Sequence, residues 1–206
     1  MSKSAENKPS STTQTKSYKV LITIVGVLAA LFAYGVIRGV VSTLQGSGTP
    51  TDNITGSTSW KEFNSTKFAF KISFPGLPTA SDSSISVQGI DVPTTTYEKD
   101  LGDSYYTVQV VSYPSQFIMS DINARLEGAL NGSVQNTEGA TLTSSSYLTF
   151  NGYTALRGTI SVPENDPPYT EYELLFLKGN DLYIFLSVGA SEDDFNKFVN
   201  SFGYKS

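Results

Sequence analysis

The sequence predicts an α+β fold: a mostly antiparallel sheet of seven or eight strands packed with two helices, preceded by one transmembrane helix. Three observations predict it. Several short segments alternate apolar and polar residues, which is the period of a half-buried strand. Two other segments repeat apolar residues every three or four positions, as amphipathic helices do. Residues 20–37 form an uncharged apolar run long enough for a helix that spans a bilayer.

The N-terminal region predicts a membrane anchor at residues 20–41. Residues 1–19 are rich in Ser, Thr and Lys, and we interpret them as a disordered cytoplasmic tail. Four lysines precede the span, whereas Arg38 is the only base near its other end, so the positive-inside rule places the N-terminus in the cytoplasm. The alternative is a cleaved signal peptide, but the apolar run is longer than such peptides carry and no Ala-x-Ala site follows it. We therefore expect a single-pass protein of the cell membrane.

The rest of the chain predicts one extracytoplasmic domain on a short tether. Residues 42–59 are a flexible linker of Gly, Ser and Thr, and residues 60–206 have the length of one domain. That domain contains nine basic and seventeen acidic residues, a net charge of −8, which excludes nucleic acid as a partner. The chain has no Cys, so it carries neither a disulfide nor a lipid on a cysteine.

The domain begins with a predicted meander of three or four strands. Apolar residues alternate over 68–74, and Pro75 ends this first strand. Two weaker extended segments follow at 84–89 and 93–99. A stronger strand at 105–113 completes the meander.

The first helix is expected to begin after Ser120 and Asp121, either of which can accept a hydrogen bond from the first turn. Its apolar residues recur every four positions along one face, namely Ile122, Leu126, Leu130 and Val134. This stripe indicates a helix that covers one face of the sheet.

Two hairpins are predicted next. Asn151 and Gly152 separate two extended segments and both tolerate positive φ, which is the strongest short hairpin signal in the chain. Gly179 to Asp181 separate the strands 169–178 and 182–188. The second of these is apolar on both faces, so we expect it at the centre of the sheet.

The last helix is predicted to follow Ser191, with three acidic residues in its first turn that complement the helix dipole. Its apolar face consists of Phe195, Phe198, Val199 and Phe202, and Gly203 ends it.

The order of these segments resembles the PsbP-like superfamily, which includes the extrinsic protein P of photosystem II and DcrB-like bacterial envelope proteins. The matching stretches are FKISFPGLPT at 70–79, YYTVQVVSYP at 105–114, LTFNGYTALRGTI at 148–160, ELLFLKGNDLYIFLSVG at 173–189 and FNKFVNSFGY at 195–204. The resemblance implies an α/β/α sandwich and a non-catalytic role, binding larger assemblies or residing in the envelope. The chain has no His, so a family role that needs a His-bound metal does not carry over.

The residue types argue against an enzyme and against a cofactor. Without His and Cys, the usual nucleophile and base pairs are absent. Lys67 and Lys71, which lie near Ser and Thr, belong to the solvent side of an alternating strand. Glu171 and Glu173 lie on one face of a strand, about 7 Å apart, as a glycosidase pair would. We expect these two carboxylates simply to face water, so no catalytic residue is predicted.

Two weak binding sites are predicted. Glu98, Asp100 and Asp103 cluster in one turn, and hard cations such as Ca²⁺ take oxygen ligands from loops. Tyr105 and Tyr106 are adjacent in a strand and so point to opposite faces, which leaves one ring available for a partner. The predicted function is therefore a non-enzymatic domain, anchored by residues 20–41, that binds another envelope protein. The alternative is an envelope module that binds a small ligand or Ca²⁺.

Overall fold

The computed structural model describes residues 59–87, 90–115, 121–164 and 168–205. Within them lie ten strands and two helices. The predicted tail, membrane span and most of the linker fall outside the described residues, and no helix within those residues is long and apolar enough to cross a membrane. In chain order the elements are β1 (Lys61–Ser65), β2 (Phe70–Phe74), β3 (Thr79–Val87), β4 (Ile90–Asp100), β5 (Tyr105–Ser112), α2 (Ile122–Asn136), β6 (Thr141–Phe150), β7 (Tyr153–Val162), β8 (Tyr169–Lys178), β9 (Asp181–Val188), α3 (Glu192–Asn200) and β10 (Gly203–Tyr204).

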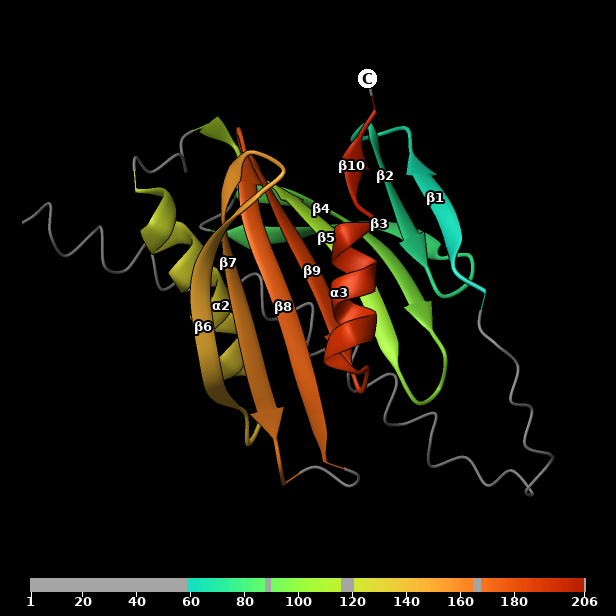
Figure 1. The fold of residues 1–206 in the computed structure, drawn as a ribbon. Helices are drawn as coiled ribbons and strands as arrows, with labels where there is room; N and C mark the ends of the chain where they lie inside the picture. Colours follow the sequence, from blue (N-terminus) through green and yellow to red (C-terminus); the bar gives the residue numbers. More distant parts are fainter. Residues whose placement is uncertain (1–58, 88–89, 116–120, 165–167, 206) are drawn as a thin grey trace, which may run out of the picture.

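The strands form two antiparallel sheets. The larger has seven strands in the order β3-β4-β5-β9-β8-β7-β6, and the smaller has the order β1-β2-β10. Helices α2 and α3 lie on opposite faces of the large sheet, and the small sheet lies on the α3 side (Figure 1). The fold is therefore the predicted α+β sandwich, with β9 at the centre of the large sheet as expected.

Most of the local signals in the sequence act as predicted, except that α3 ends at Asn200, so that Phe202 lies after the helix and Gly203 begins β10. The Asp121 side chain caps α2 by accepting from the Ala124 amide, and Ser191 caps α3 by accepting from the Asp194 amide. Asn151 and Gly152 both have positive φ, 49° and 83°, in the turn between β6 and β7. These short-range features depend only on neighbouring residues, so the sequence reveals them directly.

The strand count differs from the prediction of seven or eight. Strands β1 and β10 were not predicted, because β1 has little apolar alternation and β10 consists of two residues that pair with β2. Strands β3 and β4 are longer than the predicted segments 84–89 and 93–99. Both are rich in Ser and Thr, whose side chains give little hydrophobic signal.

Aromatic side chains fill the core on the α3 side of the large sheet. Phe176 on β8 stacks on Tyr183 of β9, with ring centroids 4.8 Å apart. Phe202, just after α3, contacts Phe185 at 5.0 Å and Phe70 of the small sheet at 5.3 Å. The small sheet and α3 are thereby joined to the large sheet through one aromatic cluster.

The core on the α2 side is aliphatic and closely packed. Leu126 and Leu130 of α2 are buried against Leu156, Ile160 and neighbouring residues of β7, β8 and β9. A Cβ atom added at Gly158 of β7 would lie 2.5 Å from Leu130 Cδ1. The absence of a side chain at position 158 therefore lets α2 approach the sheet closely.

Replacing Phe198 with Ala should lower the free energy of unfolding by about 3 to 5 kcal/mol, because it leaves a cavity between the helix and two sheets. The ring is fully buried and contacts Phe74, Tyr106 and Phe185. Urea denaturation of the full chain measures the change. The matched control is Leu77→Ala at an exposed position, where we expect a change within about 0.5 kcal/mol. Equal effects of the two substitutions would contradict this packing.

Candidate functional site

A groove runs between helix α2 and the edge strand β6, which we call the α2–β6 groove. Its central hollow has a volume of about 290 Å³. The hollow is lined by Glu127, Leu130, Asn131, Leu142, Ser145, Ser146, Tyr147 and Leu156. Apolar groups thus form its floor, and hydroxyl, amide and carboxylate groups line its sides.

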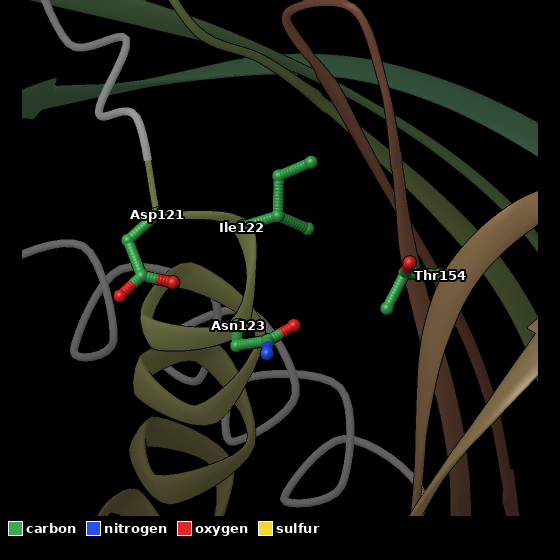
Figure 2. A pocket seen from close by; sticks show the side chains of 4 residues that line it. All are labelled: Asp121, Ile122, Asn123 and Thr154. Atoms are coloured by element: carbon green, nitrogen blue, oxygen red, sulfur yellow. The ribbon is translucent and has the colours of Figure 1, made fainter.

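A second, shallower hollow of about 380 Å³ lies at the start of α2. Figure 2 shows Asp121, Ile122 and Asn123 on the helix side and Thr154 of β7 on the other. Ile122 was predicted to lie in the core, but nearly half of its surface is exposed here. Leu126, one turn later, is fully buried, so the apolar stripe of α2 enters the core only after its first residue, which lines this hollow instead.

Tyr147 joins the two hollows. Its hydroxyl donates to the Glu127 carboxylate at 2.9 Å and lies 3.3 Å from the Asn123 carbonyl oxygen. The ring itself is 43% exposed, and Leu148 beside it is 38% exposed on the opposite face of β6. An exposed aromatic ring that is held at its polar end is well suited to contact another molecule.

The structure does not gather the three predicted cation ligands around one point. Glu98 accepts a hydrogen bond from the Tyr105 hydroxyl at 2.7 Å, and Asp100 accepts one from the Gly102 amide. Asp103 contacts its neighbour Ser104. Among the described residues, no group of three or more His, Cys, Asp or Glu side chains is placed to hold a metal ion. The hydrogen bonds within the turn account for these acids.

The expectation that one ring of the tyrosine pair is exposed is wrong. Tyr105 is 4% exposed and Tyr106 is 3% exposed. The two rings do point to opposite faces, but β5 lies inside the large sheet and both of its faces are covered there. Tyr106 packs edge-on against Trp60 and Phe198, with centroids 5.7 and 5.5 Å away.

The expectation that Glu171 and Glu173 face water is also wrong, because both side chains are 0% exposed. They share the face of β8 that carries Leu175 and Leu177, and that face lies beneath α2. None of their four carboxylate oxygens has a hydrogen-bond partner. Helix α2 buries the two glutamates by covering this face of β8. The sequence did not indicate that the helix lies over this strand.

Burial has a large effect on the acidity of this pair. Burial first, and then the negative charge of Glu173, raises the pKa of Glu171 well above its ordinary value. Burial raises the pKa of Glu173 to about 7. The nearby Glu171 carboxyl and Ser133 hydroxyl offset part of that rise, although neither meets the geometry of a hydrogen bond. The pair therefore holds protons at a pH where exposed carboxyls have lost them.

The sequence did contain a signal for this pair. Glu171 and Glu173 have the same parity as Leu175 and Leu177, so alternation alone places all four on one face. Nothing in the sequence, however, indicated that α2 covers this face of the strand as far as position 171. The groove residues on β6 gave no comparable signal, since Ser and Tyr on an edge strand resemble any solvent-facing strand.

Comparisons with known proteins show the fold alone. No family model matches the sequence, and no curated protein matches it. The structure is similar to the solution structure of cyanobacterial PsbP, CyanoP, from Synechocystis sp. PCC 6803, with a TM-score of 0.50 and 17% identity over 75% of this chain and 98% of that one. The domain thus has a PsbP-like fold, as the resemblance implied.

A second similar structure is a protein of unknown function from Pseudomonas aeruginosa described as a putative regulator. Its TM-score is 0.37 at 8% identity, over 66% of this chain and 85% of that one.

Replacing Tyr105 with Phe should lower the free energy of unfolding by about 1.5 to 3 kcal/mol, because it removes a buried hydroxyl that donates to the Glu98 carboxylate. Urea denaturation of the full chain checks this. Tyr147→Phe is the matched control, since it removes an exposed hydrogen bond to Glu127 and should change the stability by less than about 0.5 kcal/mol. A larger loss of unfolding free energy in Tyr147→Phe than in Tyr105→Phe would contradict this ranking of the two hydrogen bonds.

Proposed function

We propose that this chain is a non-enzymatic domain, tethered to the cell membrane by residues 20–41, whose extracytoplasmic part binds another envelope protein through strand β6 and the α2–β6 groove. The observation that carries the proposal is the uncharged, exposed edge strand beside a groove of mixed polarity. The tether supports it, because confinement near the bilayer raises the effective concentration for a partner in the same membrane.

Strand β6 lacks most of the features that keep sheet edges from pairing. Natural edge strands are usually short, charged, interrupted by proline or covered. Residues 141–150 contain no charged residue and no proline over ten positions, and nine of the ten are at least partly exposed. A register shift between Leu142 and Ser144 protects only the start of the strand. No described residue pairs with the outer side of β6, so the rest of the edge can accept an extended segment of a partner.

The other edge of the large sheet is better protected. Strand β3 carries Asp82, whose carboxylate accepts from Lys67 at 2.7 Å and from the Thr95 hydroxyl at 2.6 Å. A charged, engaged side chain on an edge opposes the addition of another strand. Of the two edges, β6 is therefore the better candidate for the binding surface.

Charge and shape indicate the kind of segment that would bind. Asp121 and Glu127 border the groove, and the domain as a whole is acidic. Ile122 and Tyr147 offer apolar surface on the same side. An extended segment that carries apolar and basic side chains together on one of its two faces complements these features, since that face then presents both kinds of side chain to the groove and its acids.

The residues argue against catalysis in this domain. The sequence has no His and no Cys. The carboxyl pair Glu171 and Glu173 has no exposed surface through which a substrate would reach it. A binding role, by contrast, needs only the exposed groove and edge.

The orientation can be tested with a protease added to spheroplasts that express the full chain with an epitope at its N-terminus. We expect residues 60–206 to be digested while the epitope on residues 1–19 stays protected, because the lysine-rich side of the span remains in the cytoplasm. Spheroplasts opened with detergent provide the control, in which both parts should be digested. Protection of the C-terminal domain in closed spheroplasts would contradict the proposed topology.

The binding surface can be tested by photo-crosslinking in intact cells. A photoreactive amino acid at Thr149 of β6 should give a discrete heavier adduct, whereas one at Ser83 of β3 should not. Adding Ser144→Lys and Ser146→Lys should reduce the β6 adduct about tenfold, because charge opposes strand addition.

The matched control for this experiment is a pair of lysines on the opposite edge, Ser81→Lys and Ser84→Lys, which should leave the β6 adduct unchanged. An adduct from β3 alone, or one that is insensitive to the lysines on β6, would contradict the proposed surface.

A further inference from the structure

The carboxyl pair Glu171 and Glu173 has no counter-charge among the described residues. Both side chains are fully buried, and the ion pairs that the described residues form involve other groups. All four carboxylate oxygens are without a hydrogen-bond partner. Because removing even one carboxylate from water without compensation is very unfavourable, two adjacent ionised carboxylates are not a stable arrangement here.

The described elements packed around the pair bring no cation within reach of it. The cross-strand neighbours of Glu171 are Ile160 and Val188, and those of Glu173 are Gly158 and Leu186. Helix α2 brings the Ser133 hydroxyl close to Glu173. The titratable and charged groups that share this face of the large sheet, or project toward it from α2, are Tyr169, Tyr105, Glu98, Asp100, Tyr113, Arg125, and, at the edge, Tyr147 and Glu127.

The one cation in that set is engaged elsewhere. Arg125 lies two turns before Ser133 in α2, with its guanidinium 5.5 Å from the centre of the Tyr113 ring. Tyr113 lies six residues along the chain from Thr107 of β5, which is level with Glu173, or about 20 Å away. Among the described residues, no ion pair joins Arg125 to either carboxylate. The acids and tyrosines that remain cannot neutralise a carboxylate.

Either protons or a bound metal ion could compensate the pair, and the donor set favours protons. Calcium takes six to eight oxygen ligands, and magnesium takes six. The pair offers two carboxyl groups and one nearby hydroxyl, and the described residues contain no third acidic or imidazole ligand placed with them. A carboxyl group beside a carboxylate, by contrast, needs only one shared proton to remove the repulsion.

We propose that Glu171 and Glu173 form a buried proton-binding site that holds helix α2 on the sheet, so that loss of the proton releases the helix. Helix α2 lies over the pair with small residues, Gly128, Ala129, Gly132 and Ser133, on its buried face. Neither carboxyl has exposed surface while the helix is packed. Ionisation of the pair therefore requires the helix to move away and let water in.

The direction of the pH dependence follows from proton linkage. The packed state binds the proton more tightly than a state with the carboxyls in water, whose pKa is about 4.5. The packing is therefore most stable below pH 4.5 and weakens as the pH rises through about 7. Because the α2–β6 groove is built partly from this helix, its shape would depend on pH in the same direction.

Hydrogen exchange of the full chain in detergent tests the proposal, with rates corrected for the intrinsic effect of pH. Between pH 5 and 7 we expect the opening constant for α2 amides to rise at least tenfold per pH unit, because each proton released on opening contributes a factor of ten. Amides of β9 should show a much smaller change. In Glu171→Gln/Glu173→Gln, a neutral pair of nearly the same shape, the α2 amides should lose this dependence. Glu138→Gln, at an exposed position after the helix, should behave as the wild type does.

A second measurement keeps the test decisive if the double variant does not fold. Carbon-13 spectra of the glutamate carboxyls in the wild-type chain should show two signals that titrate well above pH 4.5. Titration of every glutamate near its ordinary pKa would overturn the proposal, as would equal pH dependence in the wild type and the double variant. Finally, 1 mM Ca²⁺ or Mg²⁺ could slow the exchange of α2 amides at pH 8 in the wild type but not in the double variant. That result would show that the pair binds a metal ion and not a proton, and it would overturn the proposal.

Discussion

The large sheet must be covered on both faces, and most of the structure follows from how this is achieved. Strand β9 lies at its centre and is apolar on both sides, so it cannot face water on either one. Helix α2 covers the sheet with aliphatic residues from one side. Helix α3 and the small sheet cover it with aromatic residues from the other. The inner strands are thereby buried on both faces, and only the edges of the sheet remain open.

Incomplete coverage creates the candidate binding surface. Helix α2 packs on β7 and β8, where Gly158 allows a close approach, and not squarely over the edge strand β6. The space left between the helix and that edge is the α2–β6 groove, bordered by Tyr147 and Ile122. A domain that uses an open edge for binding needs a rigid sheet behind it, and the aromatic core on the α3 side provides one. In the proposed function, stability and binding thus depend on different parts of the same sheet.

Complete coverage creates the carboxyl pair. Glu171 and Glu173 lie near the start of β8, where α2 still covers the strand, and they are enclosed along with the leucines that follow them. Apolar residues of similar volume would serve packing better, because buried carboxyls reduce stability when they ionise. The presence of two acids in this position is the most specific chemical feature of the domain. In the proposed proton-binding site, this pair connects the protonation of the core to the position of one wall of the groove.

The sequence by itself determined the features that depend on neighbouring residues. These include the caps at Asp121 and Ser191, the Asn151-Gly152 turn, the alternation of the strands and the central place of β9; the order of the segments further implied the PsbP-like sandwich. The tertiary structure alone decided which faces are covered. One ring of the Tyr105 and Tyr106 pair and both glutamates were expected to be exposed, yet all four side chains are buried, and β10 exists only through its pairing with β2. The physical reason is that burial of a strand depends on elements distant in the chain, whereas its alternation depends only on the strand itself.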